Sequence, residues 1–154
     1  MTPKHPVSVL VVVHTAALEV LLLERILRAG WWQSVTGSLD APQEPLAAAA
    51  LREVGEETGI RADPGALRRW NLVYTFEIYP QWRHRFVAGT THNTEHVFSL
   101  ELPGKVDVAL PPQEHRASRW LPWREAAGEC LSWSNRDAIR ILGQRERCAG
   151  TRSL

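Results

Sequence analysis

The stretch GSLDAPQEPLAAAALREVGEETGI, residues 37–60, decides more about the fold than any other part of the chain. It opens as a loop with two prolines, and LAAAALREVGEETGI then predicts an α-helix, because alanine, leucine and glutamate have high helix propensity. We expect Glu44 to cap this helix and Pro45 to suit its first turn. Gly59 stands where a left-handed C-terminal cap belongs, so the helix is expected to end there.

One edge of the expected helix is unusually acidic. Apolar side chains recur every four residues on its packed side: Leu46, Ala50 and Val54. Beside them Glu53, Glu56 and Glu57 fall within an arc of about 100° in the last turns, where the helix dipole disfavours negative charge. A bound divalent ion such as Mg²⁺, which takes oxygen ligands and substrate phosphates, would relieve their repulsion. On spacing alone, a merely solvated acidic face is an equally good reading.

Apolar runs elsewhere predict strands at Val7–Val13, Val20–Leu23, Trp31–Thr36, Leu72–Ile78, Glu95–Leu100 and Ala117–Leu121. A last helix is expected from Ser134 to about Arg147, with Asp137 completing a variant capping box and Ile139 and Leu142 on the apolar face. Strands interleaved with a few helices predict a layered α/β or α+β domain. The chain shows no linker, so residues 1–154 are expected to form one domain, with its core at about 4–142 and a tail at about 148–154.

Composition excludes several classes of protein. The 154 residues include 44% hydrophobic and 23% charged ones, with a formal net charge of +1, which argues against a nucleic-acid binder. Val7–Val13 is too short for a membrane span and reads as a buried strand rather than a signal peptide, so no membrane partner is expected. Cys130 and Cys148 form no C-x-x-C pair, which favours a reducing cytoplasm.

The helical segment and the loop before it resemble the Nudix box, G-x5-E-x7-R-E-U-x-E-E-x-G-U, where U is apolar. The matching residues are Gly37, Glu44, Arg52, Glu53, Val54, Glu56, Glu57, Gly59 and Ile60. One departure exists, because six residues rather than five separate Gly37 from Glu44. The extra residue lies in the loop and should leave the helix face intact.

The resemblance implies a Nudix hydrolase, with a mixed sheet between helices, that uses Mg²⁺ or, as a substitute, Mn²⁺. It implies that Glu53 and Glu57 are the main metal ligands and that Glu56 supports them, while one carboxylate acts as the base. Glu44 and Arg52 would pair and brace the loop, a structural role shared with Gly37 and Gly59. In one subfamily, a glutamate at the position of Glu114 completes the metal site. The alternative is that Glu114 is a solvated loop residue.

Four further segments are similar to bacterial enzymes that hydrolyse dihydroneopterin triphosphate in folate synthesis. They are KHPVSVLVVV (4–13), WWQSVTGSL (31–39), FEIYPQWRHRFVAGTTHNTEHVF (76–98) and LSWSNRDAI (131–139). This likeness implies cleavage of 7,8-dihydroneopterin 3′-triphosphate into dihydroneopterin monophosphate and pyrophosphate. The same chemistry on a deoxynucleoside triphosphate or an oxidised purine nucleotide is the nearest alternative. A Nudix module that binds ligand without hydrolysing it is a second one.

The expected substrate contacts come from these segments. The cations suited to phosphates are Lys4, Arg25, Arg83 and Arg85, although Arg83–Arg85 could also be an exposed loop. The resemblance adds Thr36, Phe76, Glu77, Ile78, Tyr79 and Ser132. In a strand, Phe76 and Ile78 face one side while Glu77 and Tyr79 face the other, so only one of these pairs is expected to touch the ring. The histidines His14, His92, His96 and His115 lack ligand spacing and read as structural or surface residues. The sequence is compatible with a monomer or a small homo-oligomer.

Overall fold

A computed structural model of the protein describes residues 2–152, with the side chains of residues 2–145. The sheet in this part of the chain has seven strands: β1 (Val7–Thr15), β2 (Glu19–Arg25), β3 (Trp32–Gln33), β4 (Val35–Ser38), β5 (Leu67–Glu77), β6 (His92–Leu102) and β7 (His115–Pro122). The helices are α1 (Leu46–Thr58), α2 (Trp123–Glu129) and α3 (Trp133–Arg152), with two short 3-10 helices, η1 (Pro64–Ala66) and η2 (Pro80–Arg85).

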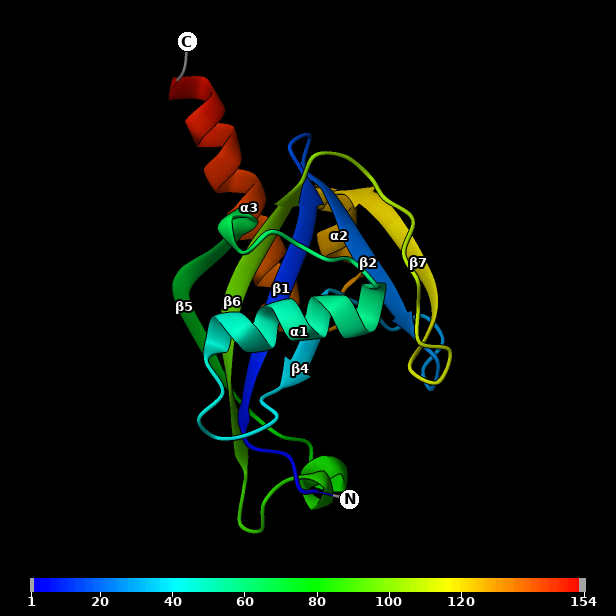
Figure 1. Ribbon diagram of the computed structural model, residues 1–154, viewed down its shortest axis with the longest axis vertical. Coiled ribbons are helices and arrows are strands. Elements are labelled where there is room, and N and C mark those ends of the chain that lie inside the picture. The colour runs from blue at the N-terminus through cyan, green and yellow to red at the C-terminus, as the bar shows by residue number, and fades with distance from the viewer. Residues whose placement is uncertain (1, 153–154) are drawn as a thin grey trace.

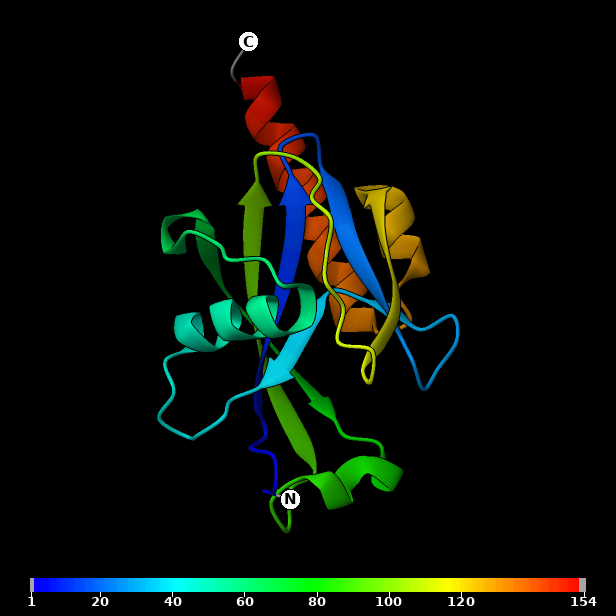
Figure 2. The same ribbon diagram turned by 45° about the vertical axis from the view of Figure 1, so that its right-hand side comes forward.

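The sheet is mixed, and β1 lies at its centre. β1 runs parallel to β6 along its whole length, and its other edge pairs antiparallel with β4 near the start and with β2 near the end. The path β3-β2-β1-β6-β5 is completed by β4 on β1 and β7 on β2. Figure 1 shows α1 across one face of this sheet, with α2 and α3 behind the opposite face, and Figure 2 shows the same arrangement turned by 45°. The expected mixed sheet between helices is confirmed.

Helices on both faces explain why β1 is apolar at every position from Val9 to Val13. Val9, Val11 and Val13 belong to the core under α1, whereas Leu10 and Val12 belong to the core under α2 and α3. Each side is therefore buried, and a strand covered on both faces has no reason to alternate with polar residues. None of the described helices is long and apolar enough to cross a membrane.

The ends of α1 differ in how well local sequence anticipated them. Gly59 has φ 74° and donates its N–H to the Gly55 carbonyl, so the predicted left-handed cap is confirmed. The prediction for Glu44 is wrong, because Pro45 itself occupies the N-cap position and no side chain caps the helix. The Glu44 carboxylate instead accepts hydrogen bonds from Arg52 and from the Asp40 N–H.

The capping box expected at the last helix is also wrong. Helix α3 begins at Trp133, the Ser134 hydroxyl donates to Glu95, and Asp137 accepts a hydrogen bond from the Tyr74 hydroxyl. Both side chains expected to cap the helix instead form hydrogen bonds with residues distant in the sequence. Ile139 and Leu142 are buried, as expected. The helix continues to Arg152, past its predicted end and through most of the segment expected to be a tail, and residues 153–154 lie outside the described chain.

The predicted strand Trp31–Thr36 is split into β3 and β4. At Ser34, between them, the backbone N–H donates to Asn135 Oδ1 (2.8 Å) and the hydroxyl accepts from Asn135 Nδ2 (2.9 Å). This pair of contacts with α3 replaces strand pairing at one residue. It allows β3 to pair with β2 while β4 pairs with β1. The short helix α2 had not been expected.

Candidate active site

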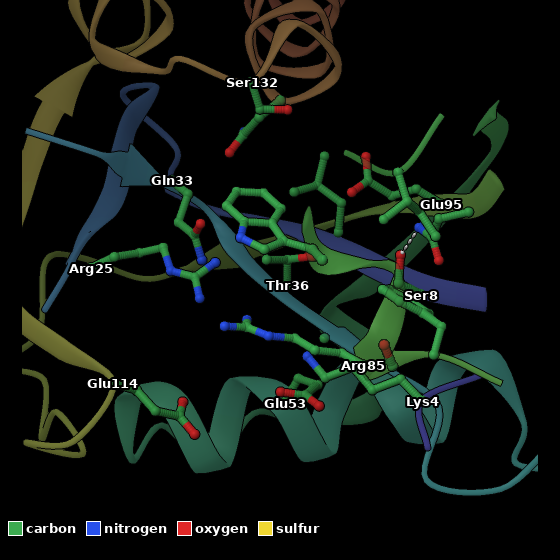
Figure 3. Close-up of a pocket in the computed structure, with 18 of the residues that line it drawn as sticks. Lys4, Ser8, Arg25, Gln33, Thr36, Glu53, Arg85, Glu95, Glu114 and Ser132 are labelled. Atoms are coloured by element: carbon green, nitrogen blue, oxygen red, sulfur yellow. Dashed lines mark hydrogen bonds between the residues drawn. The ribbon is translucent and has the colours of Figure 1, made fainter. Parts of the chain in front are cut away.

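A cavity of about 1100 Å³ lies beside the C-terminal half of α1. Its walls come from the N-terminal segment, β1, the end of β2, β3, β4, α1, the end of β5, η2, the start of β6, the loop before β7 and the start of α3, among other segments. Figure 3 shows Glu53 on α1 and Glu114 from the loop on one side, and Ser132 and Glu95 on the other. Segments far apart in the sequence thus converge on one space.

The wall on α1 is acidic and largely buried. Glu53 and Glu57 are only 9% and 5% exposed, whereas Glu56 is exposed. Burial raises the pKa of Glu57 to about 9, and repulsion from Glu53 adds to the effect. Burial also raises the pKa of Glu53 to about 7, although hydrogen bonding to Arg52 opposes it. Carboxyl groups whose pKa values are raised in this way lose their protons when a cation binds between them.

Arg52 ties the loop before α1 to the acidic wall. Its guanidinium reaches Glu44 at 2.9 and 3.0 Å, the Asp40 carboxylate at 3.1 Å and the Ser38 carbonyl at 3.1 Å. On its other side, Nη1 donates to Glu53 Oε1 at 2.8 Å. The hydrogen bond from Arg52 lowers the pKa of Glu44, so the brace is an ion pair near neutral pH. Asp40, an additional partner of Arg52, comes from the six-residue spacer.

Gly37 makes room for the acidic wall. A Cβ at this position would lie 2.1 Å from the carboxyl carbon of Glu53, far inside van der Waals contact. One residue before it, the Thr36 N–H donates to Glu57 Oε2 at 3.2 Å. The backbone of β4 therefore leaves room for Glu53 and hydrogen-bonds Glu57, two of the three box glutamates on α1.

A group of possible metal ligands lies at the other end of the acidic wall. Ligand atoms of Glu57, Glu114 and His115 all lie within 4.8 Å of one another. His115 Nδ1 is buried and has no hydrogen-bond partner among the described residues. Burial, with repulsion from Arg25, lowers the pKa of His115 to about 4, which leaves a neutral imidazole. Two carboxylates and an unpartnered imidazole fit a divalent cation.

His115 had been taken as structural or surface, and its adjacency to Glu114 was the one local signal that could have singled it out. Being buried at 4% exposure, it is not a surface residue. Of the other histidines, His14 and His96 are set in β1 and β6, and His92 is exposed at the start of β6.

Three cations enter the cavity between its two sides. Lys4, Arg25 and Arg85 line it, and Figure 3 shows the charged ends of Arg25 and Arg85 in the space above Glu114 and Glu53. Burial, together with repulsion from Arg85 and Arg25, lowers the pKa of Lys4. The backbone N–H of Lys4 donates to the Arg85 carbonyl at 2.8 Å, which fastens the N-terminal segment to η2.

The structure separates Arg83 from the cations that line the cavity. Its Nη2 donates to Glu77 Oε1 at 2.6 Å, and its Nε donates to the Ile78 carbonyl at 2.9 Å. Arg83 is not among the described residues of the cavity wall. It holds the end of β5 against η2, while Arg85 faces the cavity.

The end of the cavity away from α1 combines apolar walls with buried polar groups. Phe76, Ile78 and Ser132 line it, and Phe76 lies opposite Asn93 in the β5–β6 register. Glu77 and Tyr79 also reach the wall, but both are exposed. The sequence had not singled out Asn93 or Glu95. Two polar residues alternating along a buried strand were the available signal.

Comparisons with known proteins agree with this geometry. The family model described as NUDIX domain matches residues 4–141. Dihydroneopterin triphosphate diphosphatase of Escherichia coli K12 is 42% identical over 143 residues, covering 88% of this chain and 91% of that protein. The Haemophilus influenzae protein of the same name is 34% identical, covering 91% and 89%.

Solved structures of related proteins are similar to this one. The E. coli dihydroneopterin triphosphate pyrophosphohydrolase superposes with a TM-score of 0.83 at 40% identity, covering 92% of this chain and 97% of that one. A MutT protein of Methanosarcina mazei, at 24% identity and a TM-score of 0.66 over 94% and 97% of the two chains, shares the fold. With a family model spanning most of its length and relatives of this similarity, the chain belongs to the Nudix hydrolase family.

Proposed function

We propose that the protein hydrolyses 7,8-dihydroneopterin 3′-triphosphate to dihydroneopterin monophosphate and pyrophosphate, a step of folate synthesis. The observation that carries this proposal is the order of groups along one cavity. Figure 3 shows Glu53 and Glu114 at the acidic wall, the cations Arg25 and Arg85 above it, and Ser132 and Glu95 beyond them; apolar residues also line the cavity. A metal-bound triphosphate joined to a flat heterocycle has the same order. The names of the E. coli and H. influenzae relatives support this substrate.

Mg²⁺ is the proposed cofactor, with Mn²⁺ as a substitute, held by Glu53, Glu57 and Glu114. The family in general uses divalent metals, and the group of Glu57, Glu114 and His115 supports this location. Such an ion, when bound, neutralises phosphate oxygens and lowers the pKa of a bound water.

The chain's own groups do the rest of the proposed work. Arg52 orients Glu53, and the Thr36 N–H orients Glu57. Lys4, Arg25 and Arg85 bind and align the phosphates for in-line attack. The proton of the attacking water passes to one carboxylate of the site, and we propose Glu53, Glu56 and Glu57 as the catalytic residues.

The remaining proposed contacts concern the heterocycle and its surroundings. Thr36, Phe76, Ile78 and Ser132 line the cavity and are proposed to contact substrate; Glu77 and Tyr79 are proposed to do so from its mouth. Arg83 would act only indirectly, through its bonds to Glu77 and Ile78. A small-molecule triphosphate is the proposed partner, without nucleic acid or membrane, and a cytoplasmic location and a single domain stay predictions.

The test is the release of pyrophosphate and of orthophosphate from dihydroneopterin triphosphate, with and without Mg²⁺, beside dATP and 8-oxo-dGTP. We expect Mg²⁺-dependent pyrophosphate release with the highest kcat/KM for the pterin. Equal or better turnover of a nucleotide would keep the Nudix chemistry and reject the pterin assignment. Absence of metal-dependent turnover of every diphosphate tried would favour a binding module instead.

A further inference from the structure

Two buried polar side chains on β6 have so far been given no function. Asn93 and Glu95 are 5% and 6% exposed, and both line the cavity at the end away from α1. They alternate along the strand and therefore point to the same side of the sheet. The registers pair Glu95 with Ser8 on β1 and with Tyr74 on β5. Polar groups at this depth need partners, and their hydrogen bonds are therefore informative.

Each of the two side chains has an acceptor left over. The Ser134 hydroxyl donates to Glu95 Oε1 at 2.9 Å, and no other described residue hydrogen-bonds this carboxyl group. Asn93 Nδ2 donates to the Ser8 hydroxyl at 2.8 Å, the contact drawn at Ser8 in Figure 3. Asn93 Oδ1 is buried and has no partner among the described residues. A buried acceptor such as Asn93 Oδ1 is costly without a donor, so this end of the cavity is suited to a ligand that brings N–H groups.

The walls around these acceptors suit a flat ring. Leu10, Phe76 and Ile78 supply apolar surface, and Trp133 lines the cavity at the start of α3. Burial raises the pKa of Glu95 to about 7, so a ligand that donates hydrogen bonds would draw it into the charged form. Glu77, the acceptor nearest in sequence to Phe76, is already paired with Arg83, and its side chain is 67% exposed.

We propose that Glu95, assisted by Asn93, recognises the heterocycle of the substrate by accepting hydrogen bonds from a ring N–H and the amino group beside it. This inference rests on the proposed function and names the residue that selects the ring. A 2-amino-4-oxopyrimidine edge, present in pterins and in guanine, offers these two donors side by side. Adenine has a ring acceptor beside its amino group. An ionised carboxylate has no donor for that acceptor, so it can pair with the amino group alone.

Substituting Glu95→Gln tests the proposal, because glutamine keeps the shape of the side chain and removes the charge. Glu101→Gln on the same strand is the matched control, since Glu101 is exposed and outside the cavity wall. The kcat and KM of wild type and both variants would be measured with dihydroneopterin triphosphate, dGTP and dATP. Thermal unfolding would verify that each variant is folded.

We expect Glu95→Gln to lower kcat/KM for the pterin and for dGTP by about ten- to a hundredfold, mainly through KM, because charge-assisted hydrogen bonds are lost. The dATP value should change less than threefold, and Glu101→Gln should change none of the three. Equal losses for all three substrates, or none, would overturn the assignment. If wild type instead prefers dATP to the pterin, the proposed function itself fails, whatever Glu95→Gln does.

Direct binding gives a readout independent of turnover. Neopterin, which lacks the triphosphate, can be titrated into the metal-free protein by fluorescence. Wild type and Glu101→Gln should bind it alike, and Glu95→Gln should bind at least tenfold more weakly. Ser134→Ala, which removes the hydroxyl that holds Glu95, should give a smaller loss in the same direction. Unchanged neopterin binding in folded Glu95→Gln would refute ring recognition by this residue.

Discussion

The substitution Gly37→Ala should lower activity while leaving stability nearly unchanged. The new Cβ would lie 2.1 Å from the Glu53 carboxyl carbon and 2.2 and 2.4 Å from its two oxygens, whereas ordinary contact begins near 3.4 Å. The carboxylate must therefore move by more than 1 Å. Because it is the end of a flexible side chain, the fold can yield there, but Glu53 leaves the position in which Arg52 holds it. A misplacement of this size costs about 100-fold in rate, or about 2.7 kcal/mol.

The assay is kcat/KM for dihydroneopterin triphosphate at saturating Mg²⁺, with thermal unfolding of the same preparations. Gly104→Ala is the control, because a Cβ there meets nothing within 4 Å. We expect Gly37→Ala to lose about two decades of kcat/KM, with a Tm close to that of wild type, and Gly104→Ala to lose neither. If Gly37→Ala stayed within threefold of wild type, the position of the Glu53 carboxylate would not limit the reaction, and the reasoning would be refuted.

Three further predictions address the same cavity. Glu53→Gln should lower kcat by several decades with little loss of stability, and a variant within tenfold of wild type would remove Glu53 from the mechanism. His115→Ala should weaken Mn²⁺ binding in a calorimetric titration, because the imidazole lies with Glu57 and Glu114; unchanged affinity would exclude it as a ligand. Glu95 has its folded pKa raised to about 7 from 4.5, so its contribution to stability is fully present below pH 4.5 and is lost as pH rises through 7. Between pH 4 and pH 8, the metal-free wild type should therefore lose up to about 3 kcal/mol more unfolding free energy than Glu95→Gln; equal losses in urea titrations would contradict the shift.

Local sequence was sufficient for elements whose cause lies within a few residues. The helix Leu46–Thr58 and its end at Gly59 follow from propensity and from the left-handed residue that a C-terminal cap requires. The β1 strand follows from an apolar run that suits burial on both faces. The spacing of the Nudix box likewise identified the family, because helical geometry sets the relative positions of Glu53, Glu56 and Glu57 on one helix.

Hydrogen bonds between side chains distant in the sequence could not be predicted from local sequence. Ser134 looks like a helix cap until Glu95, 39 residues away, takes its hydroxyl. The strand Trp31–Thr36 looks continuous until Asn135, 101 residues from Ser34, replaces its pairing.

The sequence by itself therefore determined the family, the helix of the Nudix box and most strands of this protein. Only the tertiary structure decided how polar groups meet the cavity: Glu95 is buried in its wall, whereas Glu77 reaches the wall with an exposed side chain that is paired with Arg83. The physical reason is that propensity and periodicity act between neighbours along the chain. Burial and the choice of hydrogen-bond partner depend instead on strand register and on contacts between distant segments.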